Sequence, residues 1–468
     1  RPSDRERLLR MLEHVEGMPF ESLCAGIAWE WESFAEYVRA LGARPLGMNV
    51  GALLGHSALR AYVMGDDAYA RAAQASEVEA MAALVREGMA AGALGLATSR
   101  SPAHVGEGGR PVPSRQAGRA EVDALVGAMA ESGRGVLEIT PETFPVSADE
   151  LAWLQGLARA SRRPVSFSAI LDVPDRRGAW EAVYAQLRAG LAAGAAVYPQ
   201  VSCRPMRFDF DLATGCASLD AMPCWRRWRA APTDAARLAL VADAEFRAAL
   251  KAEALGRAEA PASRRWGDVV LEEAGRREHA PFVGRTLAEI AAARGGDAID
   301  ALLELSAAEE LRARFSMLLM NYEEEHVGVL LARPESLIAL SDAGAHVSVL
   351  CDAGYATHLL GRWVRERGLF GWEEAVRRLS AMPAAIYGIP ERGLLARGRV
   401  ADVVCFDPTR VAARAPEKVH DFPGGAARYV VRAEGVEHVL IRGEEFMARG
   451  EWTGAHPGAV LDGAAGGR

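Results

Sequence analysis

Two residues near the C-terminal third of the chain, Asp342 and His346, have types and spacing that could do chemistry. They stand in the run Leu-Ser-Asp-Ala-Gly-Ala-His at 340–346, which follows an apolar stretch at 336–340. Such a stretch is typical of a buried strand, and a carboxylate just after a strand is where barrel enzymes place a base or a metal ligand. Asp342 is therefore a candidate base or ligand, and His346 a candidate donor that orients it. The alternative is an ordinary turn capped by Asp342.

A further histidine, His56, stands in a Gly-His-Ser turn after a predicted strand at 45–54. A histidine at a strand end could hydrogen-bond a substrate carbonyl or support a metal ligand. The alternative is a buried structural histidine whose ring nitrogens are satisfied by the protein.

Strands that could position these residues alternate with helical patterns along the chain. The helical patterns cover about 5–42, 76–91, 119–132, 147–161 and 177–193. The predicted strands are 45–54, 92–98, 135–140, 164–170, 195–201 and 336–341. Regular strand–helix alternation predicts a parallel sheet with right-handed crossovers. The pattern changes at about 204–325, which we interpret as an insertion, and short strands with Gly turns at 393–468 predict a small β-sheet domain after a barrel at 1–392.

Composition excludes several classes of function. The chain has 468 residues, half of them hydrophobic and a quarter charged, with a net charge of -8. This charge argues against nucleic acid or an anionic membrane as a partner, and no apolar run reaches the ~18 residues that span a bilayer. Six cysteines without close pairing are typical of reduced thiols, which predicts a cytoplasmic protein. The sequence does not predict an oligomeric state.

Several ordered motifs carry a resemblance to a known family. The segment 393–407, a Gly-x-Leu-x-x-Gly-x-x-Ala-Asp pattern closed by Phe-Asp, and the Ile-Arg-Gly at 441–443 resemble the closing β-domain of the amidohydrolase superfamily. The segments 49–60, 195–199, 341–346 and 453–458 resemble the N-acyl-D-amino-acid deacylase (D-aminoacylase) branch. The resemblance covers nearly the whole chain.

The resemblance implies an α/β fold of the (β/α)8 TIM-barrel type, with the six predicted strands as strands three to eight. It also implies zinc, with Asp342 as a ligand and as the base that takes a proton from an attacking water. The family's His-x-His pair and bridging cysteine would lie on strands one and two, and the chain begins at Arg1 without a Met. We therefore expect these residues upstream of Arg1.

One departure from the family concerns the metal. The family places histidines near positions that here are Thr140 and Ala169. Glu138 and Glu142 are nearby oxygen donors that zinc could accept, or else exposed or capping carboxylates. One zinc ion is therefore predicted rather than two.

The substrate implied by the resemblance, a small N-acyl-D-amino acid, carries a free carboxylate. Tyr198 matches a family position that contacts this carboxylate. Arg204, just after the same strand, offers a planar fork for it. Arg207 is a competing candidate, and the alternative for Arg204 is a surface ion pair.

Together these features predict a metal-dependent hydrolase of a linear amide bond, which deacylates N-acyl-D-amino acids. Two alternatives stay open. One is a metal-poor homologue that binds a small acidic ligand without catalysis. The other is an amidohydrolase that acts on a cyclic amide.

Overall fold

The computed structural model describes residues 2–106, 109–173, 176, 178–213, 219, 222–256, 265–346, 348, 350–389 and 391–463. Cys216 and the last residues of the predicted C-terminal domain, 464–468, lie outside them. The chain forms two compact units. Unit 1 contains 1–170, 178–203 and 328–468, and unit 2 contains 171–177 and 204–327. The predicted insertion falls in unit 2, whereas the predicted C-terminal β-domain belongs to unit 1.

A six-stranded sheet in which every neighbouring pair is parallel organises unit 1, in the order β1-β2-β3-β4-β5-β9. The prediction of a barrel-type α/β fold with six parallel strands is confirmed. The strands are β1 (Leu54–Gly55), β2 (Gly95–Ser99), β3 (Val136–Thr140), β4 (Val165–Ser168), β5 (Val197–Val201) and β9 (Leu337–Ile338).

Alternation along these strands separates an apolar face from a polar one. Leu96, Leu137, Ile139 and Phe167 are completely buried. The residues between them are small or polar, and register brings Ala97, Glu138, Ser166 and Tyr198 into one row across the sheet. Because side chains alternate along a strand, Ser99 and Thr140 belong to the next row, at the carboxyl ends.

Glycine is required where β2 approaches β3. A Cβ on Gly95 would lie 2.0 Å from the carbonyl oxygen of Val136. The two strands could not keep this register with a larger residue at position 95, and the register sets Ser99 opposite Thr140.

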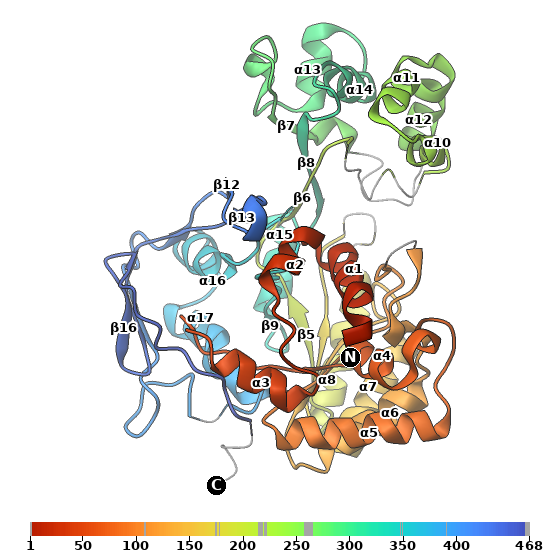
Figure 1. Ribbon diagram of the computed structural model, residues 1–468. Helices are drawn as coiled ribbons and strands as arrows, with labels where there is room; N and C mark the ends of the chain where they lie inside the picture. The colour runs from red at the N-terminus through yellow and green to blue at the C-terminus, as the bar shows by residue number, and fades with distance from the viewer. Residues whose placement is uncertain are drawn as a thin grey trace. The chain divides into compact units, whose positions relative to one another are not determined.

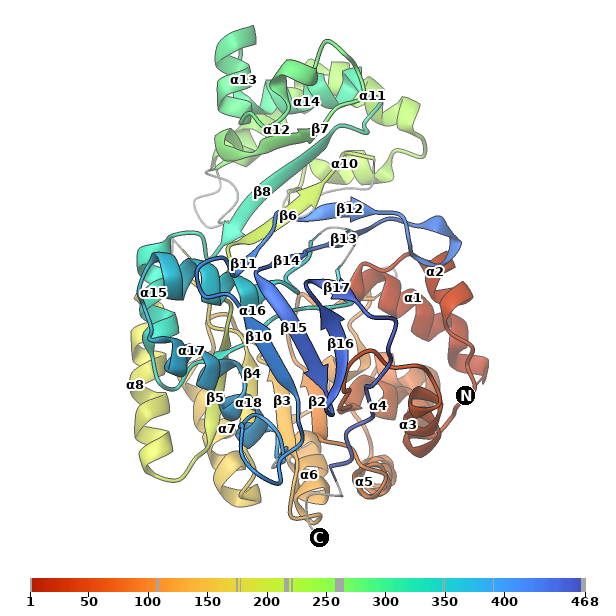
Figure 2. The same ribbon diagram turned by 90° about the vertical axis from the view of Figure 1, so that its left-hand side faces the viewer.

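Helices that connect the strands pack side by side along the sheet, as Figure 2 shows. Their apolar positions recur at helical spacing, so each buries one face. They are α4 (His56–Met64), α5 (Ala75–Ala90), α6 (Arg119–Ala130), α7 (Ala148–Ser161) and α8 (Ala179–Ala192). The later helices of unit 1 include α16 (Tyr355–His358), which a π-helix (Leu359–Glu366) follows directly, α17 (Trp372–Leu379) and α18 (Ala381–Ile386).

The first part of the chain is three helices rather than the continuous helical segment predicted at 5–42. They are α1 (Arg5–Glu16), α2 (Phe20–Gly26) and α3 (Phe34–Gly42), shown in red in Figure 1. Helix α1 ends at Gly17, which adopts a left-handed φ of 61° that favours glycine. Helix α3 begins at a capping box between Ser33 and Glu36.

Short antiparallel strands form the C-terminal part of unit 1. They are β10 (Val403–Phe406), β11 (Ala412–Ala413), β12 (Glu417–Val419), β13 (Arg428–Val430), β14 (Ala433–Glu434), β15 (Val436–Ile441), β16 (Glu444–Ala448) and β17 (Glu451–Trp452). Four of them form one sheet in the order β10-β15-β16-β17.

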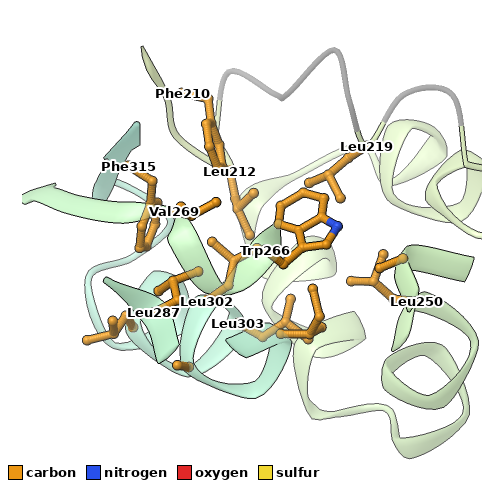
Figure 3. Close-up of a cluster of buried hydrophobic side chains, with 14 of the residues drawn as sticks. Phe210, Leu212, Leu219, Leu250, Trp266, Val269, Leu287, Leu302, Leu303 and Phe315 are labelled. Atoms are coloured by element: carbon orange, nitrogen blue, oxygen red, sulfur yellow. The ribbon is translucent and has the colours of Figure 1, made fainter. Parts of the chain in front are cut away.

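Unit 2 has its own sheet and core. Its sheet has the order β6-β8-β7, with β6 (Met206–Phe210), β7 (Val270–Glu273) and β8 (Arg314–Met320). Its helices include α10 (Trp225–Ala230), α11 (Asp234–Ala242), α12 (Ala244–Gly256), α13 (Leu287–Arg294) and α14 (Ala298–Ala308). Trp266 lies among buried side chains that include Leu212, Val269 and Leu303, as Figure 3 shows. Helix α15 (Glu324–Ala332) contains the point where the chain returns to unit 1.

In the described ranges, no helix combines the length and the apolar character that crossing a membrane requires.

Candidate active site

A cavity of about 280 Å³ lies in unit 1 where β1, β2 and β3 end. Its polar wall comes from the strand ends and the loop after β2, and α1 supplies three apolar side chains and Glu16. The carboxyl ends of parallel strands are where α/β barrels build their active sites, so this cavity is the candidate active site. The lining residues are Met11, Leu12, Val15, Glu16, Gly55, His56, Ser57, Ala97, Thr98, Ser99, His104, Val112, Ser114, Glu138 and Thr140.

His56 touches this cavity, but both of its ring nitrogens are bonded to the protein. Nδ1 lies 2.8 Å from the Thr98 hydroxyl, and Nε2 lies 2.9 Å from a carboxylate oxygen of Glu121 on α6. Arg60 donates to the same carboxylate at 2.5 Å. All four side chains are buried. The bonding matches the structural alternative for His56, while a catalytic role stays a prediction.

Electrostatics in this buried group favour a neutral imidazole beside an ionised carboxylate. Burial lowers the pKa of His56, against the opposing effect of Glu121. Burial alone would raise the pKa of Glu121, but hydrogen bonds from His56 and Arg60 outweigh it, so the pKa lies below its usual value.

A serine–histidine pair lies on the cavity wall. Ser99 Oγ, at the end of β2, lies 2.6 Å from Nδ1 of His104, in the loop that follows. The loop is held by further bonds, because the His104 carbonyl accepts from Arg115 at 3.2 Å and the Ser99 carbonyl accepts from Ser114 at 2.8 Å.

Asp342 and His346 lie close enough to this wall to act on it electrostatically. Asp342 is exposed, in a turn four residues beyond the end of β9, which is shorter than the strand predicted at 336–341. Burial is the largest cause of the raised pKa of Glu16, and Asp342 adds to it. The His346 backbone N–H donates to the Glu16 carbonyl oxygen at 2.5 Å. The turn therefore packs against the end of α1, and the roles of Asp342 and His346 stay predictions.

The described residues do not fit a zinc site. At the ends of β3 and β4 the side chains are hydroxyls, and Thr140 Oγ1 lies 3.1 Å from Ser168 Oγ. Glu138 accepts a hydrogen bond from the Tyr387 hydroxyl at 2.7 Å, and Glu142 accepts one from Arg100 at 2.6 Å. Within the part of the chain that the structure describes, no three His, Cys, Asp or Glu side chains come together to hold a metal ion. Zinc sites normally have three or four protein ligands.

The two predicted carboxylate-binding residues have different surroundings. Tyr198 on β5 packs, half-buried, against an apolar cluster of Val136, Leu337 and Ile386. Arg204 belongs to unit 2, where its carbonyl oxygen accepts from Asn321 at 2.8 Å. In the same unit, the side chain of Arg207 donates to Glu272 at 2.8 Å. The substrate-binding role of Tyr198 and Arg204 stays a prediction.

Sequence reasoning missed Glu121, Ser99 and His104. Glu121 is 65 residues from His56, so no local pattern joins them. The Ser-Arg-Ser-Pro-Ala-His run at 99–104 did carry a signal, since a hydroxyl at a strand end and a histidine five residues later can meet across a turn.

The parallel sheet, with a cavity at its strand ends, defines a barrel-type α/β fold, and sequence comparison gives the family. Residues 10–445 match the Amidohydrolase family. The chain belongs to this family, which confirms the resemblance noted from its motifs.

Two individual relatives indicate which members of this family the chain is similar to. D-aminoacylase of Alcaligenes xylosoxydans xylosoxydans is 27% identical over 451 residues, which are 95% of this chain and 76% of that protein. N-acyl-D-glutamate deacylase of the same organism is 35% identical over 169 residues, 35% of this chain and 31% of that protein. The predicted class, an amidohydrolase similar to D-aminoacylase, is confirmed at this level.

Solved structures show the same fold. A D-aminoacylase structure has a TM-score of 0.59 at 23% identity, covering 97% of this chain and 80% of that one. N-acyl-D-glutamate deacylase from Bordetella bronchiseptica, complexed with zinc and a phosphonate inhibitor, has a TM-score of 0.59 at 24% identity, covering 92% and 75%.

Proposed function

We propose that this protein hydrolyses the amide bond of small N-acyl-D-amino acids. The observation that carries the proposal is the position of Asp342, a carboxylate after the last strand of the sheet, electrostatically coupled to Glu16 and His104 on the cavity wall. The relatives named D-aminoacylase and N-acyl-D-glutamate deacylase support this substrate class.

In the proposed reaction, water attacks the amide carbonyl and Asp342 takes its proton. The protonated carboxyl group of Asp342 then returns the proton to the amine as the carbon–nitrogen bond breaks, so the products are a carboxylic acid and a free D-amino acid. A base within reach of its proton contributes typically 10²–10⁴-fold to such a reaction. The cavity volume of about 280 Å³ suits a small substrate. Tyr198 is proposed to bind the substrate carboxylate.

Metal content is a separate part of the proposal. The resemblance implies one zinc ion with Asp342 among its ligands, and zinc is present in the solved N-acyl-D-glutamate deacylase structure. The described residues bring no set of three ligands together. The proposed reaction therefore contains no step at a metal ion.

The test is a substrate panel. Purified protein is incubated with N-acetyl-D-amino acids, their L-enantiomers and cyclic imides, and release of free amine is followed. We expect release from the D-enantiomers alone. Hydrolysis confined to the cyclic imides would replace the proposal by the cyclic-amide alternative.

A second candidate function is binding of a small acidic ligand without catalysis. It is favoured by His56, which is fully engaged by Thr98 and Glu121, and by Thr140 and Ala169, which stand near the positions where the resemblance implies histidines. Saturable binding of an N-acetyl-D-amino acid by calorimetry, with no product after prolonged incubation, would support this function over hydrolysis.

A further inference from the structure

Glu138 lines the candidate active-site cavity, and the water mechanism proposed above does not use it. It lies on β3, half-buried, and its neighbours across the sheet are Ala97 on β2 and Ser166 on β4. Residues in register share one face of a sheet. Glu138 is therefore a carboxylate between two uncharged neighbours on that face.

A phenol holds the Glu138 carboxylate without neutralising it. The Tyr387 hydroxyl donates to Glu138 Oε2 at 2.7 Å. Burial is the main cause of the raised pKa of Tyr387, and the charge of Glu138 raises it further, so the hydroxyl stays protonated and remains a donor. The bond fixes the position of the carboxylate and leaves its negative charge for another group to balance.

The charged side chains that line the cavity are acidic. Among the described residues of the lining, Glu16 and Glu138 are acids and none is Lys or Arg. His104 also lines the cavity, and its pKa is lowered mainly by burial, which favours the neutral imidazole. The lining therefore offers two carboxylates and no permanent positive charge to balance them.

Charges just outside the lining have both signs. In addition to burial, His346 and Arg115 lower the pKa of His104, whereas Asp342 acts in the opposite direction. Because these outer charges oppose one another, the carboxylates of the lining decide the sign of the field inside the cavity. Such a field attracts a cation and repels an anion.

The cavity is small enough for a single carboxylate to change an affinity measurably. Its volume is about 280 Å³. At an effective dielectric constant of about 20, one charge about 8 Å away, which is the width of a sphere of this volume, changes an affinity about 30-fold. Solvent and salt weaken this effect, so we expect about 10-fold from Glu138.

The proposed partner of the substrate carboxylate, Tyr198, lies in the same row two strands from Glu138. Neighbouring strands lie about 4.8 Å apart, so the backbones at the two positions are about 10 Å apart. Tyr387 packs against the same apolar cluster as Tyr198. This separation suits an amino acid whose α-carboxylate is bound at one position and whose long side chain reaches the other.

We propose that Glu138, positioned by Tyr387, selects the side chain of the substrate by its charge. The selected class is N-acyl-D-amino acids with an ammonium or guanidinium side chain, which forms a charge-assisted hydrogen bond with the carboxylate. Acidic side chains are rejected by like-charge repulsion. This inference rests on the deacylation proposed above. All of these substrates carry the same α-carboxylate, so the selection acts on the side chain alone.

Two pairs of nearly isosteric substrates isolate the charge of the side chain. N-acetyl-D-arginine differs from N-acetyl-D-citrulline by one positive charge, and N-acetyl-D-glutamate differs from N-acetyl-D-glutamine by one negative charge. Release of free amino acid by the purified protein gives kcat/KM for each. We expect the arginine substrate to exceed the citrulline one, and the glutamine substrate to exceed the glutamate one, by about 10-fold. Equal values within either pair would overturn the proposal.

Variants test whether Glu138 is the selecting group. E138Q removes the charge but keeps an acceptor for the Tyr387 hydroxyl, so both ratios should fall about 10-fold, towards one. E138D keeps the charge and should retain both preferences. Y387F removes only the hydroxyl and should lower both ratios by less than E138Q, which also tests the role if E138Q does not fold. Ratios that survive in E138Q and in Y387F would overturn it.

E131Q is the matched control. Glu131 is exposed at the end of α6, pairs with Arg86 at 2.8 Å and does not line the cavity. The variant removes an equal charge, and both ratios should stay as in wild type. A fall in E131Q as large as in E138Q would mean that net charge rather than Glu138 sets the preference, and would overturn the proposal.

The charge selection and the deacylation on which it rests fail in different ways. If the arginine and citrulline substrates are cleaved at equal rates, deacylation stands and the selection is overturned. If no N-acetyl-D-amino acid is cleaved, deacylation fails, and calorimetry with the same pairs decides the selection. Tighter binding of N-acetyl-D-arginine than of N-acetyl-D-citrulline, lost in E138Q, would then support it, and equal or absent binding would overturn it.

Discussion

Nε2 of His56 lies 2.9 Å from a carboxylate oxygen of Glu121, and both side chains are buried in unit 1. The contact joins the first turn of α4 to the first turn of α6, and Thr98 on β2 bonds the other ring nitrogen. The group therefore fixes how two helices meet the strand that ends at Ser99.

Glu121→Gln should destabilise the protein strongly. Glutamine can still accept one hydrogen bond, but it cannot neutralise Arg60, which is completely buried. Breaking a buried ion pair by removing one charge costs about 3–5 kcal/mol. Urea unfolding of wild type and variant measures this difference.

A neighbouring acidic residue on the same helix provides the control. Asp123 is exposed and accepts a hydrogen bond from Trp153. Asp123→Asn should change the free energy of unfolding by less than about 0.5 kcal/mol. Equal urea midpoints for Glu121→Gln and wild type would mean that the burial of Arg60 does not depend on the charge of Glu121.

Unit 2 should become less stable as the pH rises through about 6. Burial raises the pKa of Asp209 to about 6, although its partner Arg314, 2.9 Å away, opposes the shift. The folded state then binds the proton more tightly than the unfolded state, so the favourable contribution present at low pH is lost above the folded-state pKa. For one group with this pKa, the loss from pH 5 to pH 7.5 is about 1.4 kcal/mol.

Hydrogen exchange of the β8 amides, corrected for the intrinsic effect of pH, measures this loss. Asp209→Asn should remove most of the pH dependence. Asp234→Asn, at a half-exposed position of α11, should leave it in place. Protection that rises between pH 5 and pH 7.5 in wild type would contradict the assignment.

Zinc should be held weakly by the purified chain. Asp342 is exposed, and the described residues do not gather three ligands around any ion, whereas tight zinc sites in proteins use three or four. Elemental analysis after dialysis should therefore find well under one zinc per chain. Stoichiometric zinc that Asp342→Asn removes would contradict this expectation and restore the family's metal chemistry.

Much of the parallel sheet could be predicted from the sequence because its pattern is local. Strands such as β3 and β5 are short apolar runs between helical patterns, and they form within a residue or two of the predicted ranges. The strand predicted at 45–54 was largely wrong, because only Leu54–Gly55 joins the sheet. Much of this segment instead bonds residues near the C-terminus, with Val50 N–H donating to the Ala459 carbonyl at 2.9 Å. No pattern within the segment indicates so distant a partner.

Residues of the candidate site could be predicted only where a side chain that can act in catalysis directly follows a strand pattern in the sequence. Asp342 and His56 stood out because each follows an apolar run. The hydrogen bond between Glu121 and Nε2 of His56 joins α6 to α4. The spacing of the two residues in the sequence does not indicate this contact. The contact of His104 with Ser99 likewise depends on the path of a long loop.

The most direct test of the proposed function is the initial rate at which the purified protein releases free amino acid from matched N-acetyl-D- and N-acetyl-L-amino acids, measured for wild type and Asp342→Asn. We expect wild type to cleave the D-enantiomer selectively. Loss of the base should reduce that rate by about 10²-fold or more at an unchanged fold, judged by circular dichroism. Equal rates for the two enantiomers, or a variant as fast as wild type, would contradict the proposal.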